Sequence, residues 1–310
     1  MESACRGGQQ NPQPRARFIY QEPENRSAIV IWISLKRSSL ISHRSILKSN
    51  PKRLILAVRN LERGNTAVSE LTKLEATSIK IDLRQLDQSN FLSVKAFSKG
   101  LKGQKVDSEI GDNYETDLQV HVLGPTLLSL LLLQNVRSAA SARAFCSDLA
   151  NPHMRFVSSG LHAMAKFPEG NLPAGEVQAA LNDQTKYNRA DRYQTTKLIG
   201  LLWVKESASS IEKEHIVVNA PNLGFCKTSL MRDASGIIMD IIKPSPSCVV
   251  DATIVKEDEI HGRYLSEAHI IDEAVIARGD DGQRLQKKIW NEIVGALKES
   301  DVPLTSSVPL

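Results

Sequence analysis

A short strand, a long helix and a second strand follow one another between residues 154 and 221, and this unit constrains the fold more than any other part of the sequence. Residues 154–157 form an apolar run that leads into Ser158, Ser159 and a glycine. Residues 198–204 carry the apolar face of a helix that would pack on a sheet, and residues 216–221 form the next apolar run. The unit predicts an α/β fold.

Tyr193 and Lys197 lie four residues apart in the helix of this unit. Side chains at this spacing share one helix face, so the Lys197 ammonium could lie beneath the Tyr193 phenol and favour its ionised form. A serine hydroxyl at the end of the neighbouring strand could hold a substrate oxygen against the same phenol. The three residue types suit proton transfer in carbonyl and alcohol chemistry. The spacing alone is also that of an ordinary exposed pair on a solvated helix face.

The order of these features resembles the short-chain dehydrogenase/reductase family, and in detail its fungal members from natural-product pathways. A serine ends a strand, Tyr-x-x-x-Lys follows on the next helix, and a turn with Gly224 and Thr228 follows the next strand. The likeness runs from about residue 50 to the C-terminus, with one large gap. It implies a Rossmann-type, doubly wound parallel sheet in a single domain.

By position, the resemblance makes Tyr193 the general acid/base and Lys197 its partner, and both would also contact the cofactor, Lys197 at the ribose. Ser159 would orient the substrate, and Thr228 would contact the nicotinamide carboxamide. Because Ser158 directly precedes Ser159, the choice between the two serines follows the family's pattern.

Two further residues are candidates for binding the dinucleotide. Arg59 follows the strand expected at Arg53–Val58, where such a strand meets the adenosine ribose, and a basic residue there suits a 2′-phosphate. Asp82 stands where the family lines the adenine pocket. We therefore expect NADP in preference to NAD. A solvated arginine and a carboxylate at a strand end would give the same pattern.

Two departures from the family pattern affect the cofactor site and the sheet. A dinucleotide site needs glycines in the first strand-to-helix turn because the backbone must approach the pyrophosphate closely. Residues 32–43 contain no glycine, and Ile33, Arg37 and Ser39 occupy the family's glycine positions. Residues 102–111 replace the family's fourth strand, so we expect a sheet that lacks a central strand.

These departures leave two interpretations open. In the first, the chain is an NADP-preferring oxidoreductase that interconverts a secondary alcohol and a ketone on an apolar polycyclic terpenoid or polyketide. In the second, it is an inactive relative or a binding protein that keeps Ser159, Tyr193 and Lys197 but cannot hold the dinucleotide. Misplaced exon boundaries in an intact gene would favour the first interpretation, and a decayed gene the second.

His121 stands where relatives have an asparagine that helps to place a proton-relay water. The histidine could replace that asparagine in part, or it could be a packed core histidine.

Composition limits the partners and the location of the protein. The net charge of +4 is spread along 310 residues, without a basic block interleaved with aromatics, which argues against nucleic acid. The four cysteines lack metal-ligand spacing, so we expect free thiols in the cytoplasm and no metal site. Residues 122–133 are the most apolar segment and fall short of the roughly 20 residues that cross a bilayer. The resemblance also implies a homo-oligomer.

The ends of the chain are expected to lie outside the domain. Residues 1–26 are rich in Gln, Pro, Arg and Gly and contain no apolar signal region, which predicts a disordered N-terminal tail. The Rossmann domain would span residues 27–300, and residues 301–310 would form a C-terminal tail.

Overall fold

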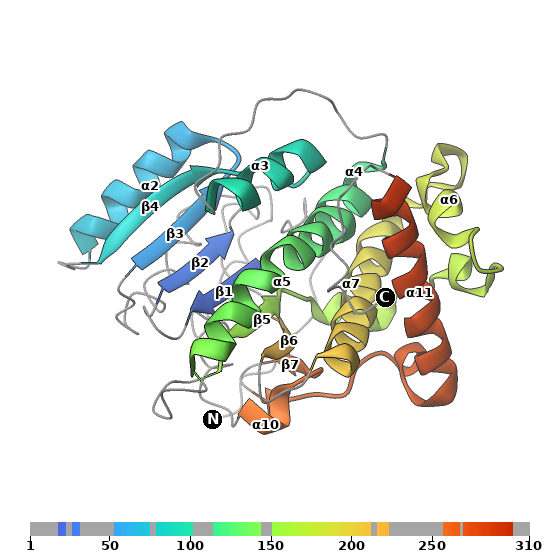
Figure 1. The fold of residues 1–310 in the computed structure, drawn as a ribbon. Helices are drawn as coiled ribbons and strands as arrows, with labels where there is room; N and C mark the ends of the chain where they lie inside the picture. The colour runs from blue at the N-terminus through green and yellow to red at the C-terminus, as the bar shows by residue number, and fades with distance from the viewer. Residues whose placement is uncertain are drawn as a thin grey trace, which may run out of the picture.

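The computed structural model describes residues 18–22, 27–31, 53–74, 79–101, 114–143, 151–211, 216–222, 257–266 and 269–299. Their strands form one eight-stranded sheet in the order β4-β3-β2-β1-β5-β6-β7-β8 (Figure 1). The strands are β1 (Phe18–Glu22), β2 (Ser27–Ile31), β3 (Arg53–Val58), β4 (Lys80–Gln85), β5 (His153–Phe156), β6 (Val217–Asn222), β7 (Tyr264–Ser266) and β8 (His269–Ile270).

Most neighbouring strands run parallel, which confirms the expected Rossmann-type fold. The pairs β2–β3, β3–β4, β5–β6 and β6–β7 are all parallel. β8 adds a short antiparallel edge beside β7. Parallel neighbours need long crossover connections, and in this chain the crossovers between β3 and β4 and between β5 and β6 contain helices.

β1 fills the place between β2 and β5 where a central strand was expected to be missing. Phe18 pairs with Ile31 of β2 on one side and with Phe156 of β5 on the other, and both pairings are antiparallel. The prediction of a tail over residues 1–26 is therefore wrong for residues 18–22. β1 keeps the sheet continuous, because its backbone groups pair on both sides. The segment 102–111 lies outside the described residues.

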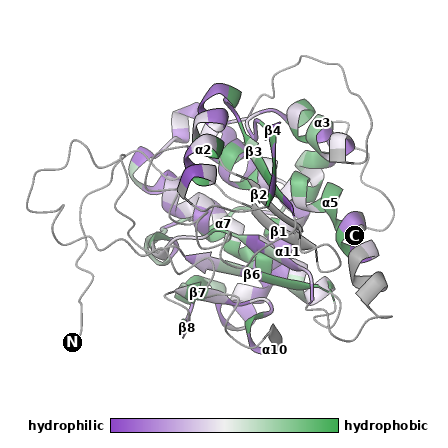
Figure 2. Cartoon of the chain, turned by 90° about the vertical axis from the view of Figure 1, so that its left-hand side faces the viewer, coloured by the Kyte–Doolittle hydropathy of each residue, from purple (hydrophilic) through white to green (hydrophobic). Residues whose placement is uncertain are grey.

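Helices cover both faces of the sheet. The long ones are α2 (Leu61–Leu74), α3 (Phe91–Leu101), α5 (Gly124–Arg143), α7 (Arg189–Ser210) and α11 (Gly279–Glu299). Short ones are α4 (Thr116–Leu118), the π-helical turn η2 (Gln119–Leu123), α6 (Val177–Asn182) and α10 (Glu257–Ile260). Figure 2 shows α2 and α3 on opposite sides of β3 and β4, with apolar residues in β3 and hydrophilic residues on the outer side of α2.

The helix α7 lies inside the protein because a second helix covers it. Asn188 caps its N-terminus through a bond from the Ala190 amide, and residues on all sides of the helix are buried. α11 packs along it, and the rings of Trp203 and Trp290 stack with centroids 4.1 Å apart. The apolar face expected for residues 198–204 is thus part of the core.

The apolar segment expected as a buried helix is longer than the sequence indicated. Residues 116–138 form a helical stretch that is long and apolar enough to cross a membrane, but 83% of its most apolar window is buried inside the protein. α3 packs against α5, and α7 packs against η2. This burial indicates a core helix.

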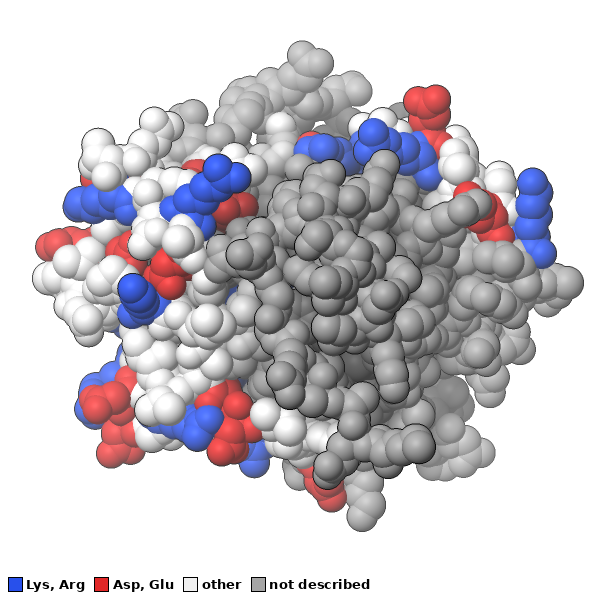
Figure 3. Space-filling view, turned by 180° about the vertical axis from the view of Figure 1, so that it is seen from behind, with Lys and Arg blue, Asp and Glu red and all other residues white. Residues whose placement is uncertain are grey.

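The described surface seen from behind carries both charge signs in alternation. Figure 3 shows Lys and Arg interspersed with Asp and Glu on this face. The part of the surface described there has no extended basic area of the kind that binds nucleic acid.

Candidate active site

Lys197 connects α7 to the end of β5 through a hydrogen bond. Its Nζ donates a hydrogen bond to the carbonyl oxygen of Val157 at 3.0 Å, and Val157 directly follows β5. The side chain is buried. This bond places the ammonium group at the carboxyl edge of the sheet, where open α/β sheets bind their ligands.

Tyr193 lies one helical turn before Lys197 and is also buried. The Lys197 Nζ is 5.6 Å from the centre of the Tyr193 ring, and His121 meets the same ring edge-on with centroids 5.4 Å apart. The alternative of an exposed pair on a solvated face is therefore excluded. An ammonium group this close favours the ionised phenol electrostatically.

Ser159 is the first residue beyond the sheet at the end of β5. Ser158 still belongs to it, because its amide donates to the Pro221 carbonyl at 2.8 Å and it bridges to Asn222 of β6. Ser159 is extended and caps the turn Gly160–Met164, with its Oγ accepting the Leu161 amide at 3.3 Å. That bond uses the oxygen as an acceptor, so the hydroxyl can still donate to a substrate. This placement favours Ser159 over Ser158.

His121 lies within η2 and touches the candidate catalytic helix. Its Nδ1 is 3.2 Å from the Thr196 hydroxyl, which itself donates to the Tyr193 carbonyl at 3.0 Å. Because the hydroxyl hydrogen is used in that bond, the histidine Nδ1 is the donor to Thr196. His121 thus lies beside the candidate pair Tyr193 and Lys197, and its contribution to a proton relay stays a prediction.

His162 is the residue at this site that the sequence did not reveal. Its Nδ1 is 2.7 Å from the Ser159 carbonyl oxygen, and its Nε2 is 3.1 Å from the Ala274 amide. Burial lowers the pKa of His162 from its ordinary value of 6.5, against an opposing effect of the bond to Ser159. Ala274 is far away in sequence, so no local pattern could have indicated this pairing.

The candidate cofactor residues differ in how the structure places them. Arg59 is exposed directly after β3 and has no ion pair among the described residues. Asp82 accepts a bond from the Arg53 Nε at 2.7 Å, which occupies one of its oxygens. Thr228 lies outside the described residues, as do the glycine-loop positions Ile33, Arg37 and Ser39.

The described cations fit an anionic dinucleotide. The exposed Arg59 guanidinium follows the carboxyl end of β3, and the ammonium of Lys197 reaches the carboxyl end of β5. Such an edge of a doubly wound sheet is where dinucleotides bind. Their roles toward a cofactor remain predictions. No group of three potential metal-ligating side chains occurs among the described residues.

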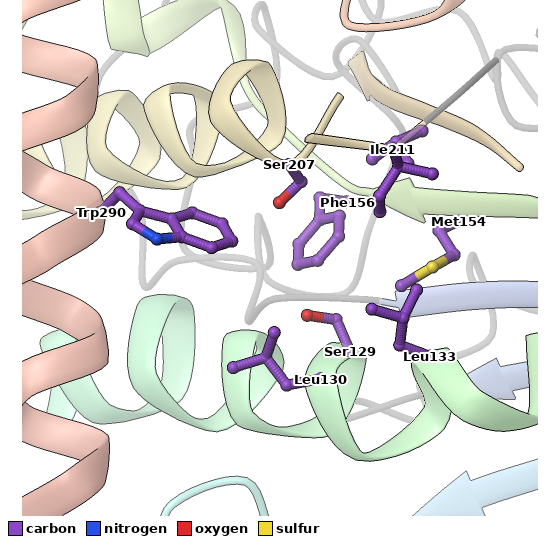
Figure 4. A pocket seen from close by; sticks show the side chains of 9 residues that line it. Ser129, Leu130, Leu133, Met154, Phe156, Ser207, Ile211 and Trp290 are labelled. Atoms are coloured by element: carbon purple, nitrogen blue, oxygen red, sulfur yellow. The ribbon is translucent and has the colours of Figure 1, made fainter. Parts of the chain in front are cut away.

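A small apolar cavity between α5, α7, α11 and the strands is not a substrate site. Figure 4 shows its lining, with Trp290 on one side and Met154 on the other. It holds about 10 Å³ of space for a water-sized molecule, which is about one water. A polycyclic substrate does not fit there.

Comparison with known proteins identifies relatives of one kind. No protein-family model matches the chain. The chain is 27% identical over 286 residues to the short-chain dehydrogenase anuD of Penicillium roqueforti, across 83% of this chain and 73% of that protein. It is 25% identical over 290 residues to the short-chain dehydrogenase/reductase dmxR8 of a Cryptosporiopsis species, across 85% and 88%. It is 30% identical over 196 residues to the short-chain dehydrogenase sol3 of Alternaria solani, across 58% and 65%.

Solved structures share the fold at low sequence identity. The carbonyl reductase Sniffer of D. melanogaster superposes with a TM-score of 0.54 at 15% identity, covering 79% of this chain and 98% of that chain. The NADPH-bound carbonyl reductase from chicken fatty liver superposes with a TM-score of 0.53 at 14% identity, covering 78% and 97%.

Proposed function

We propose, from the similarity to short-chain dehydrogenases along most of the chain, that it is a short-chain dehydrogenase/reductase that interconverts a secondary alcohol and a ketone with NADP as the hydride carrier. One observation carries this proposal. Lys197 binds the end of β5 while Tyr193 stands one turn away, so the proton-transfer pair is fixed beside the strand end that carries Ser159.

The chain's own residues account for the proton and the orientation of the substrate. Ser159 donates its hydroxyl to the substrate oxygen, and the Tyr193 Oη takes the alcohol proton during oxidation or returns it to the oxygen during reduction. The Lys197 ammonium stabilises the phenolate that forms. Positioned acid/base groups of this kind contribute about 10² to 10⁴ in rate.

Bound NADP would accept the hydride that leaves the carbinol carbon, or NADPH would deliver it to the ketone carbon. Arg59 is our candidate for the 2′-phosphate, and Asp82 for the adenine pocket. Tyr193 and Lys197 would contact the nicotinamide ribose, and Thr228 the carboxamide. This assignment favours NADP over NAD.

For the substrate, we propose an apolar polycyclic secondary metabolite of the terpenoid or polyketide class. Support comes from the relatives, which are fungal short-chain dehydrogenases. We further propose that the protein acts in the cytoplasm and as a homo-oligomer.

The second candidate is an inactive relative that serves as a binding protein. It is favoured by the absence of glycine in residues 32–43 and by the antiparallel β1 in the central position of the sheet. In the family pattern, the glycine positions form the turn that meets the pyrophosphate.

Titration of the full chain with NADPH, followed by NADPH fluorescence, separates the two candidates. The oxidoreductase binds NADPH more tightly than NADH and consumes NADPH when a polycyclic ketone such as trans-1-decalone is added. A folded chain that binds neither nucleotide at any reachable concentration would contradict the proposed function.

A further inference from the structure

We propose that His162 is a positioning residue that sets the orientation of Ser159 by holding its backbone carbonyl oxygen. The inference rests on the proposed function, because it gives Ser159 a part in the reaction. It goes beyond that function by assigning a role to a residue outside the Ser159, Tyr193 and Lys197 set.

The two hydrogen bonds of the ring fix a single tautomer. A main-chain carbonyl can only accept, so the His162 Nδ1 carries the hydrogen that is donated to Ser159. A main-chain amide can only donate, so Nε2 receives the bond from Ala274 and carries no hydrogen. The ring is therefore neutral, and rotating it by half a turn would break both bonds.

Packing holds the ring in that orientation. His162 is fully buried, and the Tyr264 ring of β7 meets it with centroids 4.5 Å apart and planes at 60°. The imidazole thus joins three segments, which are the turn Gly160–Met164, β7, and the main chain that leads into Val275–Ala277. The turn lies far in sequence from the other two segments, so the ring makes a tertiary contact and does not merely close a local turn.

The His162 ring acts on Ser159 through the main-chain carbonyl of the serine. The Ser159 carbonyl receives the His162 ring bond and also the His162 amide at 3.1 Å. The Ser159 Oγ accepts the Leu161 amide. Residues 161 and 162 thus donate hydrogen bonds to both oxygens of Ser159, the hydroxyl and the carbonyl. The His162 ring also accepts the Ala274 amide, so it connects Ser159 to that distant part of the chain. Loss of the ring bond leaves the Ser159 carbonyl with the His162 amide bond alone, which loosens the main chain and lets the hydroxyl turn away from the substrate position.

Burial, and not the nearby charges, favours the neutral His162 ring. Glu273 and Arg278 are the charged groups that act on it, with opposite effects on its pKa, while burial lowers that pKa. Glu273 is engaged by Lys205, and Arg278 binds Asp272. A proton added at Nε2 would face the Ala274 amide hydrogen and break that bond.

Three substitutions separate the two bonds of the ring. His162→Asn places an amide nitrogen near the Nδ1 position and retains the bond to the Ser159 carbonyl. His162→Gln places an amide oxygen near the Nε2 position and retains only the bond from Ala274. His162→Ala removes both. The Asn and Gln variants are controls for each other, because each keeps one of the two hydrogen bonds of the ring.

Two readouts are measured on the full chain. The first is kcat with NADPH and trans-1-decalone across pH, together with the Kd for NADPH. The second is amide hydrogen exchange at Leu161, whose N–H is bonded to the Ser159 Oγ, and it needs no turnover.

We expect kcat to fall about 10-fold to 100-fold in the Ala and Gln variants, since a small misplacement of a catalytic group has this effect. The Kd for NADPH is unchanged, and Leu161 exchanges faster in both variants. His162→Asn restores kcat across the pH range and restores slow exchange, because it keeps the bond to the Ser159 carbonyl.

Equal rescue by Gln and Asn, or slow Leu161 exchange in the Gln variant, would overturn the proposal. If the wild-type chain neither binds NADPH nor reduces the ketone, the proposed function fails. In that case the exchange comparison between the Asn and Gln variants still decides whether His162 positions Ser159.

Discussion

Phe18 of β1 is the backbone partner of Phe156 of β5, so the N-terminal segment lies directly against the strand that ends at the candidate catalytic serine. β1 also pairs with β2 on its other side. The two ladders make the sheet continuous across the position where the sequence lacks the family's fourth strand. β1 is therefore an integral part of the sheet.

Deletion of residues 1–22 is expected to abolish cooperative folding. The deletion leaves two unpaired strand edges in the middle of the sheet, and a domain of this kind has only about 5–15 kcal/mol of stability to lose. Circular dichroism during urea unfolding measures the effect. Deletion of residues 1–10 keeps β1 and serves as the control. A cooperative transition of normal amplitude in the longer deletion would show that β1 is dispensable.

Lys197→Met should reduce turnover by about 10² to 10⁴. The substitution removes the ammonium beside Tyr193 and the bond to the Val157 carbonyl. Steady-state kinetics with NADPH and trans-1-decalone provide the measurement. Lys186→Met, in a largely exposed turn, is the matched control and should keep the wild-type rate. Equal rates in both variants would refute the role of Lys197.

Arg59→Ala should weaken NADPH binding by about 10-fold while leaving NADH binding unchanged. A hydrogen bond to a charged phosphate contributes about 1.5–3 kcal/mol, and exposure places this guanidinium at the lower end. Fluorescence titration with both nucleotides gives the two constants. Arg63→Ala, on the exposed side of α2, tests for a general charge effect. Parallel weakening of NADH binding would rule out recognition of the 2′-phosphate.

Trp290→Ala is expected to lower the free energy of unfolding by about 3–5 kcal/mol. The Trp290 ring stacks on Trp203 with planes 14° apart and joins α11 to α7. Urea unfolding measures the loss, and Trp290→Phe should recover much of it by refilling the space. A loss below about 1 kcal/mol in the Ala variant is typical of a surface substitution, and it would contradict the role of Trp290 in joining α11 to α7.

The stability of the protein should fall as the pH falls below about 6.5, in part through His162. Burial lowers the pKa of His162 below its ordinary value of 6.5. Between the two values the unfolded chain binds more protons than the folded chain, so the stabilising contribution is present above pH 6.5 and is lost below it. Thermal unfolding of wild type and His162→Asn at a series of pH values checks this. Identical pH dependence in the two proteins would contradict it.

The sequence predicted the parts of this fold that depend on local pattern. The strand at Arg53–Val58 and the burial of the helix face in residues 198–204 follow from an apolar run and from helical periodicity. Ser159, Tyr193 and Lys197 belong to one strand–helix unit of the sequence. In the structure the helix that carries Tyr193 and Lys197 packs at the end of the strand that precedes Ser159.

Two features could not be predicted because they depend on pairing across long distances in sequence. β1 carries no pattern of its own that distinguishes it from a tail, and only its backbone bonds to Ile31 and Phe156 make it a strand. His162 looks like any histidine in a turn until Ala274 is placed beside it. In both cases the partner is chosen by tertiary packing.

A comparison of Tyr193→Phe with the wild-type chain, for NADPH binding and for turnover of trans-1-decalone, decides whether Tyr193 is the acid/base. We expect the variant to bind NADPH with an unchanged Kd and to lose turnover by about 10² to 10⁴, because only the proton-transferring hydroxyl is removed. Turnover at the wild-type rate in this variant would contradict the assignment of Tyr193 as the acid/base.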